Sequence, residues 1–291
     1  MKHCLLHRVA LMHPMGHINI IVVSIGVNRS QNSSRLKRYP KFMDEPGDDD
    51  FRYTGETNSE GLPHGHGKIE FDIGISYEGQ FKDGMMHGHG VYLFYPDLEE
   101  WADHLLYRYE GEFKENKKCG IGKTQRANGD CYIGEFRNDV MHGIGRETYG
   151  AVEDYYKGEW KHGQKEGIGL YVYANGAHYR GEWKSGNKHG KGILQYTNGD
   201  YYDGEWEYGV EHGHGYFAWI SAGAYHHGEW KQGKYHGHGV HNYGDGTNFS
   251  GQWKDGLRYG WGVYTNHLGE RIEKNWDDHS VLNSFGTDDE E

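Results

Sequence analysis

Residues 179–201 read YRGEWKSGNKHGKGILQYTNGDY, and this stretch decides the fold because it recurs along most of the chain. Its skeleton is Tyr-x-Gly-Glu-Trp-x-x-Gly-x-x-His-Gly-x-Gly, which residues 77–90 and 202–215 follow closely. Successive copies begin 23 or 24 residues apart, except for one step of 32. Repetition at a short fixed period indicates stacked repeats rather than a globular domain. The nine copies begin at Tyr53, Tyr77, Tyr109, Tyr132, Tyr156, Tyr179, Tyr202, His226 and Phe249.

Each copy, here called a unit and numbered from one to nine, is typical of a β-hairpin. Alternate side chains of a strand share a face, so Tyr179, Gly181 and Trp183 are expected to point one way. We expect Gly181 to leave room between the two rings for a side chain of a neighbouring unit. Residues 185–188 form the turn, because glycine adopts positive φ at little cost. Gly190 and Gly192 are then expected to form a bare floor for the rings.

A lone two-stranded hairpin is only marginally stable in water, so these hairpins must stack to bury their rings. The predicted fold is therefore all-β: an elongated, open, solenoid-like antiparallel meander of about nine tandem hairpins. It spans residues 53–276, with a capping half-unit at its end, between a basic then acidic tail (1–52) and an acidic tail (277–291). The expected core residues are Tyr77, Phe81, Tyr109, Phe113, Tyr132, Phe136, Tyr156, Trp160, Tyr179, Trp183, Tyr202, Trp206, Trp230, Trp253, Gly88, Gly90, Gly190, Gly192, Gly213 and Gly215.

These units resemble MORN repeats (membrane occupation and recognition nexus), and the resemblance covers residues 53–276. In layout the chain is most similar to the radial-spoke-head type of ciliary axonemes, since the acidic leader MDEPGDDD (43–50) precedes the array and an acidic tail follows it. The resemblance implies a non-catalytic structural scaffold of a cytoskeletal assembly. It also implies radial-spoke-head proteins as partners, and a location in the cytoplasm and cytoskeleton, at the axoneme of a cilium or flagellum.

Charge is distributed unevenly along the chain, whose net charge is −12. Residues 1–42 contain seven basic and no acidic side chains, so residues 43–291 hold 24 basic and 43 acidic ones. A surface this acidic repels nucleic acid and anionic lipid, which favours protein partners over either. The three cysteines show no CxxC spacing, a usage typical of a reduced, intracellular protein.

Residues 1–42 differ from the rest in more than charge. Met43 opens an ordinary acidic start, so we interpret the preceding segment as an upstream extension or a disordered tail, with a targeting sequence as the alternative. Its apolar run INIIVVSIGV (18–27) is too short to span a bilayer.

Four His-Gly-His-Gly runs begin at His64, His87, His212 and His236. Two histidines spaced by two on a strand share a face, and stacked units could align them into a Zn²⁺ or Cu²⁺ site. Other units, however, place isoleucine, lysine or tryptophan at the second position. A position that accepts this range is not expected to be a metal ligand.

Two further patterns invite a catalytic interpretation. Every unit contains Gly-x-Gly, but no helix is expected to follow it, as a nucleotide-binding loop requires. A glutamate precedes the second ring of most units, often with lysine two residues later, as in Glu182 and Lys184. We interpret these pairs as a solvated cross-strand charge ladder. Since no nucleophile and base stand out from the repeat, neither an enzyme nor a cofactor is expected.

Non-repeating segments are where a repeat array most easily places specificity. In the insertion 97–107, Trp101, Leu105 and Leu106 recur at roughly helical spacing, which suits either a loop packed on its own sheet or a docking knob. The first strand, from Tyr53, lacks the charges that protect the last strand at Lys274, so a partner strand or a second copy of the chain is expected to add there. The alternative function is a membrane–cytoskeleton tether that binds phospholipid, which a basic stripe along one face would distinguish.

Overall fold

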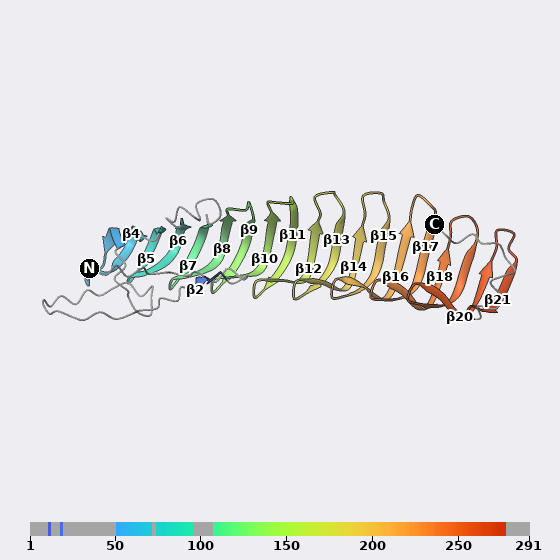
Figure 1. Ribbon diagram of the computed structural model, residues 1–291. Helices are drawn as coiled ribbons and strands as arrows, with labels where there is room; N and C mark the ends of the chain where they lie inside the picture. Colours follow the sequence, from blue (N-terminus) through green and yellow to red (C-terminus); the bar gives the residue numbers. More distant parts are fainter. Residues whose placement is uncertain (1–10, 13–17, 20–50, 72–73, 96–106, 278–291) are drawn as a thin grey trace, which may run out of the picture.

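The computed structural model describes residues 11–12, 18–19, 51–71, 74–95 and 107–277, and within them it contains strands and no helix. Strands β3 to β21 form one elongated antiparallel sheet (Figure 1). The two-residue strands β1 (Leu11–Met12) and β2 (Ile18–Asn19) pair separately with each other. No helix in the described ranges is long and apolar enough to cross a bilayer. The all-β fold of tandem hairpins predicted from the sequence is confirmed.

The first half of the sheet consists of β3 (Phe51–Thr57), β4 (Pro63–Phe71), β5 (Ile75–Lys82), β6 (Met85–Phe94), β7 (Tyr107–Lys114), β8 (Lys117–Arg126), β9 (Cys131–Arg137), β10 (Val140–Tyr149), β11 (Asp154–Lys161) and β12 (Gln164–Val172). The second half consists of β13 (His178–Lys184), β14 (Asn187–Gln195), β15 (Tyr201–Glu207), β16 (Val210–Trp219), β17 (Ala224–Lys231), β18 (Lys234–Asn242), β19 (Asn248–Lys254), β20 (Leu257–Thr265) and β21 (Arg271–Asn275).

Each strand pairs with its neighbours in sequence, so the sheet is a simple meander. Among the described strands β3 pairs only with β4 and β21 only with β20, and these two ends lie far apart (Figure 1). Unit six shows the hairpin: β13 and β14 are joined by Ser185 and Gly186, with φ angles of 49° and 84°. Two left-handed residues make the tight turn whose twist matches that of paired strands. Because the end strands β3 and β21 do not pair with each other among the described strands, the sheet is open, as expected.

A line of facing glycines crosses the sheet. In unit six Gly181 lies opposite Gly192, and Gly192 lies opposite Gly204 of the next unit. The fully buried ring of Tyr179 lies across this pair, and its hydroxyl donates to the carbonyl of Glu182 at 3.0 Å. A Cβ added at Gly192 would collide with that ring. A Cβ at Gly181 would meet the backbone of Gly192 and Lys191 and the hydroxyl of Tyr179. The expectation that this space takes a side chain of a neighbouring unit is therefore wrong.

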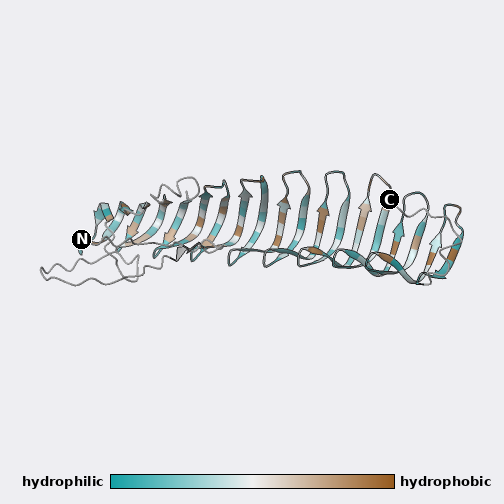
Figure 2. Cartoon of the chain, viewed as in Figure 1, coloured by the Kyte–Doolittle hydropathy of each residue, from teal (hydrophilic) through white to brown (hydrophobic). Residues whose placement is uncertain are grey.

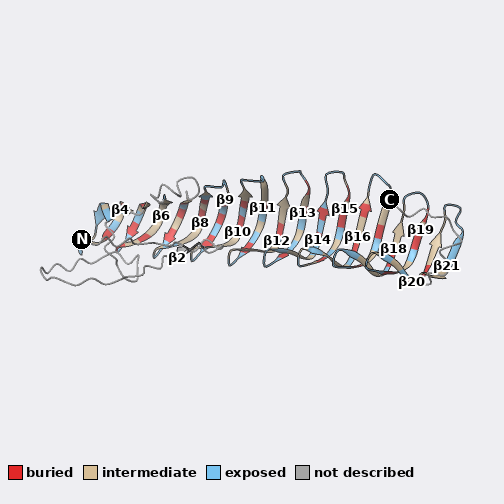
Figure 3. Ribbon diagram, in the orientation of Figure 1, coloured by how far each residue is buried: buried red, intermediate tan, exposed pale blue. Residues whose placement is uncertain are grey.

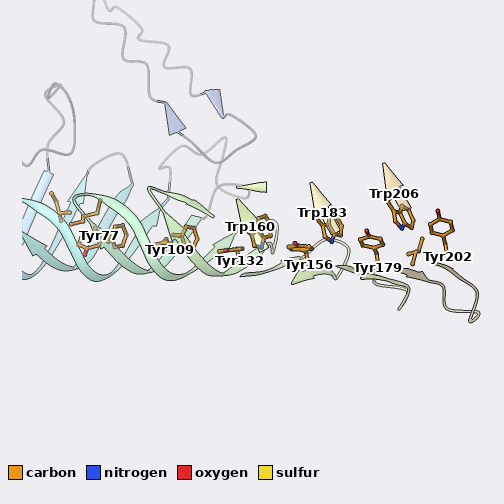
Figure 4. Close-up of a cluster of buried hydrophobic side chains, with 14 of the residues drawn as sticks. Tyr77, Tyr109, Tyr132, Tyr156, Trp160, Tyr179, Trp183, Tyr202 and Trp206 are labelled. Carbon is orange, nitrogen blue, oxygen red and sulfur yellow. The ribbon is translucent and has the colours of Figure 1, made fainter. Parts of the chain in front are cut away.

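The rings form a continuous ladder that joins the units. Tyr179 meets Trp183 of its own unit edge-on at 5.3 Å between centroids, and Trp206 of the next unit at 5.2 Å. The indole of Trp206 also donates to the carbonyl of Gly192 at 3.0 Å, which connects unit seven to unit six. Figure 4 shows the tyrosines following one another along the array with the tryptophans beside them. Buried segments accordingly recur from strand to strand, and each strand alternates polar and apolar residues (Figures 2 and 3).

The two ends use incomplete units. Tyr53 is half-buried and meets Phe81 of unit two edge-on at 5.4 Å, while Thr57 stands where the second ring is usual. At the other end Trp276 packs against Phe249 at 5.3 Å and donates to the carbonyl of Gly262 at 3.5 Å, as the tryptophans of complete units do. The last half-unit therefore continues the ladder by one ring.

Replacing Gly192 tests whether the ladder depends on its glycine floor. We expect Gly192→Ala to lower the free energy of unfolding by about 1–3 kcal/mol, because the new methyl group displaces a fully buried ring. The matched control is Lys191→Ala, one residue away and exposed, which should change stability little. Urea unfolding followed by tryptophan fluorescence measures both; equal midpoints for the two variants would contradict the floor.

Unit eight places a histidine where other units have tyrosine. His226 is fully buried, its ring stacks on Tyr235 at 3.8 Å, and neither ring nitrogen has a hydrogen-bond partner among the described residues. Burial, helped by nearby His241 and His227, lowers the pKa of His226 to about 3. The folded array therefore holds a neutral imidazole that the unfolded chain protonates near its ordinary pKa of about 6.5.

This histidine makes stability depend on pH. The pKa of His226 is lower in the folded than in the unfolded chain, so its neutral ring contributes fully to the free energy of unfolding above about pH 7. That contribution is lost as pH falls from 6.5 toward 3. At pH 5 the loss is about 2 kcal/mol for this one group. We expect His226→Tyr to remove that part of the pH dependence and to add the hydroxyl bond of the other units. Unfolding midpoints at pH 8 and pH 5 measure it; an unchanged difference between the two pH values in the variant would contradict this account.

Candidate protein-interaction surfaces

The sheet has two chemically distinct faces. On the ring face, which carries the tyrosine and tryptophan ladder, the second residue after each turn covers the rings. Lys188 places its ammonium 3.9 Å from the centre of the Trp206 ring, and the Lys165 ammonium lies 4.6 Å from that of Tyr171. Lys118 donates to the hydroxyl of Tyr107 at 2.6 Å, and burial lowers its pKa to about 8. These cations bind the protein's own rings.

On the opposite face, here called the outer face, each return strand carries a bulge. In unit six the pairing jumps from Gly181 with Gly192 to Glu182 with His189, which leaves Gly190 and Lys191 as extra residues on β14. Gly190 has a φ of 54°, which an L-residue rarely adopts. A Cβ there would meet the carboxylate of Glu182. The expectation that Gly190 lies under a ring is therefore wrong, and only Gly192 forms the floor; the equivalent glycines Gly88 and Gly213 follow Gly190 in φ and surroundings.

The glutamate before the second ring caps this bulge. Glu182 Oε1 accepts the backbone N–H of Lys191 at 2.9 Å, and Gln80 accepts that of His89 at the same distance. The same bond joins Glu56 to His66, Glu112 to Ile121, Glu135 to Ile144, Glu159 to Ile168, Glu205 to His214 and Glu229 to His238. No ion pair within the described residues joins Glu182 to Lys184. The predicted charge ladder is therefore wrong: the carboxylate is held by the backbone of its own hairpin.

If Glu182 caps the bulge, mutations have different effects on stability than if it pairs with Lys184. We expect Glu182→Ala to cost about 1–2 kcal/mol, since it leaves a backbone N–H of the bulge unpaired. Glu182→Gln should be close to neutral, because Gln80 already makes this bond in unit two. Thermal unfolding of these variants and of Lys184→Ala measures the difference. A loss on Lys184→Ala as large as that on Glu182→Ala would restore the charge ladder.

Isoleucines protrude from the outer face. Ile121, Ile144 and Ile168 occupy the position between the two glycines in three consecutive units, and they are 57, 56 and 56% exposed. Ile133 and Ile193 stand nearby on the same face, 51 and 44% exposed. The sequence reasoning treated this position only as variable. The signal available was the run of three isoleucines at one exposed strand position.

A shallow groove follows the glycine line on the outer face. Along units one to four it has a volume of about 1150 Å³, and its lining includes Gly79, Gly90 and Gly111 between two rows of side chains. A second groove of about 440 Å³ in units eight and nine is lined by Trp261 and Glu273 among others. The outer face thus carries a groove near each end of the array.

The structure shows where the histidine runs and one of the expected docking residues lie. The second histidine of each run is exposed on the outer face, and the described residues contain no group of three or more side chains able to hold a metal ion. Tyr53 belongs to the ring ladder, and its hydroxyl donates to the carbonyl of Glu56 at 2.6 Å. Its contacts thus place it in the core rather than on a free docking surface. Trp101, Leu105 and Leu106 lie outside the described residues.

Nine segments of the chain match the family model of the MORN repeat. They are residues 59–75, 77–96, 109–131, 132–150, 156–178, 179–201, 202–221, 226–248 and 249–266. This chain belongs to the MORN repeat family. MORN repeats are a non-catalytic interaction module, and nine of them account for the hairpin array described above.

Similar proteins match part of this chain. Human Alsin is 32% identical over 142 residues, which are 47% of this chain and 8% of Alsin. The human ALS2 C-terminal-like protein is 30% identical over 93 residues, or 32% of this chain and 9% of that protein. The matched segment thus covers less than a tenth of the length of these relatives. Neither is a radial-spoke-head protein, so they lend no support to the finer resemblance expected from the sequence.

Proposed function

We propose that this MORN array is a non-catalytic scaffold that docks other proteins on its outer face. The observation that carries the proposal is the exposed isoleucine row on a face whose bulge glutamates are held by backbone N–H groups. Apolar side chains gathered on a rigid exposed surface are typical of a protein contact. The ring ladder keeps that surface stiff, so partners can be held at defined distances along the array.

We propose that the assembly is cytoskeletal. Its location would be the axoneme of a cilium or flagellum, and within the axoneme the radial spoke head. The acidic leader and tail of the sequence support this assignment. Partners are then other proteins of that assembly. Strand β3 pairs only with β4 among the described strands. Its other edge therefore supports the proposal that a partner strand or a second copy of the chain adds there.

Endogenous tagging of the chain in a ciliated cell tests this function. The tagged protein is expected at the axoneme, and proximity labelling from it should recover axonemal proteins. The variant Ile121→Ser, Ile144→Ser, Ile168→Ser should lose a large part of that labelling without loss of protein. A diffuse cytosolic or plasma-membrane signal would refute the axonemal location, and full labelling by the triple variant would refute docking on the outer face.

A second candidate, a phospholipid-binding tether, is favoured by one observation. Lysines and arginines gather on the outer face of units three to six, including Lys157, Lys161 and Arg180, all of which are exposed. Basic side chains beside exposed isoleucines suit an anionic bilayer. The net charge of −12 opposes the approach of the whole molecule to such a surface, and for that reason we rank this candidate second.

A further inference from the structure

We infer that the outer face of units three to six binds an acidic α-helix that presents an apolar side chain at every seventh residue. This inference deepens the proposed scaffold function and rests on it. It names the kind of partner and the part of the array that the partner contacts.

The isoleucine row sets the spacing of the partner. Ile121, Ile144 and Ile168 are equivalent residues of consecutive units, and one strand lies between each and the next, which is a separation of two strand-to-strand steps. Neighbouring strands lie about 4.8 Å apart, so the row advances by about 10 Å per isoleucine. Seven residues of an α-helix advance about 10.5 Å. A helix laid along the array would therefore meet each isoleucine with a residue of the same heptad position.

Glycines make the row accessible. Ile144 is flanked by Gly143 and Gly145, and Ile168 by Gly167 and Gly169, so no neighbouring side chain of the same strand shields either one. Each remains more than half exposed. On the strand between Ile121 and Ile144, Ile133 adds a further apolar side chain beside the row, with Lys123 opposite it on one side and Arg146 on the other. Along the row itself the isoleucines alternate with the bulge glutamates, since Ile144 lies opposite Glu159 and Ile168 lies opposite Glu182, and cations flank the row.

Cations flank the isoleucine row on the outer face. The outer-face cations of units three to six are Lys114, Lys123, Arg137, Arg146, Lys157, Lys161, Arg180, Lys184 and Lys191, and none of them has an ion-pair partner among the described residues. The carboxylates on the same face are already engaged: Glu110 pairs with Arg108 at 2.6 Å, and the glutamates of the four bulges accept backbone N–H groups. Nine cations on a chain of net charge −12 therefore lie on this face without an ion pair among the described residues, and one of them, Arg146, stacks on the ring of Tyr155 at 4.3 Å.

This combination is confined to the middle of the array. In unit seven the corresponding outer positions hold Asp203, Glu207 and His214, and in unit eight they hold His227, Lys231 and His238, so a single lysine remains there. An acidic partner is consequently drawn to units three to six and repelled by the carboxylates of unit seven. A single helix needs only this patch, whereas an anionic bilayer would also meet the acidic remainder of the molecule. Charge and spacing together thus favour a helix over a membrane.

A synthetic four-heptad helix tests the inference on the full-length chain. The probe carries leucine once per heptad and glutamate at most other positions, with a fluorescent label; its control has the same composition with the leucines scrambled. Fluorescence anisotropy at low and at raised salt measures binding. We expect saturable binding that weakens with salt, and a scrambled peptide that binds about tenfold more weakly or worse.

Two sets of variants locate the contact. Ile121→Ser, Ile144→Ser, Ile168→Ser should raise Kd about tenfold or more, and so should Lys157→Glu, Arg180→Glu, which should also flatten the salt dependence. His214→Ser, at the isoleucine position of unit seven, should leave Kd unchanged. Circular dichroism and the unfolding midpoint serve as checks that each variant is folded, since all these side chains are exposed.

Several results would overturn the inference: no binding of the probe, equal binding of the scrambled peptide, or unchanged binding by both sets of variants. Binding of phosphatidylserine vesicles that the same variants abolish, with no binding of the helix, would assign the patch to a membrane instead. If the helix fails while proximity labelling still depends on the isoleucines, the scaffold function stands and only the helical partner is refuted. If labelling fails as well, both fall.

Discussion

The whole array depends on one contact, the tyrosine ring that lies flat across two facing glycines. A side chain at either glycine would occupy the place of the ring, as the collision at Gly192 shows. Because the ring then reaches the carbonyl of Glu182 with its hydroxyl, it satisfies a polar group as well as burying an apolar one. Each ring also forms the wall against which the next unit's tryptophan packs. The rings of neighbouring units thereby bury one another, although no second layer covers the sheet.

The two faces divide the charged side chains between structure and binding. On the ring face, lysines such as Lys188 lie over aromatic rings, where their charge interacts with the protein itself. On the outer face the glutamates, such as Glu182, accept backbone N–H groups of the recurrent bulge, and the nine cations of units three to six form no ion pairs among the described residues. An acidic chain thus presents a basic, partly apolar patch. The net charge conceals this patch because it adds the acidic residues of the other units and of the two tails.

Variation among the units lies where the ladder tolerates it. Phe249 lacks the hydroxyl, and Trp276 stands alone in the last half-unit, yet both keep the ring contacts. His226 keeps its contacts but leaves two nitrogens without partners in the described part of the chain, so unit eight is stabilised by stacking on Tyr235 in place of a hydrogen bond. Repeat arrays transmit such local weakness to neighbours through the unit interfaces, here the edge-on ring pairs.

The sequence by itself determined the fold class, the number of hairpins and the ring stripe, because strand alternation and glycine turns are local properties repeated nine times. It could not show what each glycine and glutamate contacts. Gly190 and Gly192 look alike in the sequence, but a bulge between the strands turns one toward a carboxylate and the other toward a ring. Glu182 and Lys184 look like an ion pair, yet the bulge brings a backbone N–H to the carboxylate first. Only the tertiary structure decided these contacts, and with them which charges remain free for a partner, because strand register is set between strands and not within one.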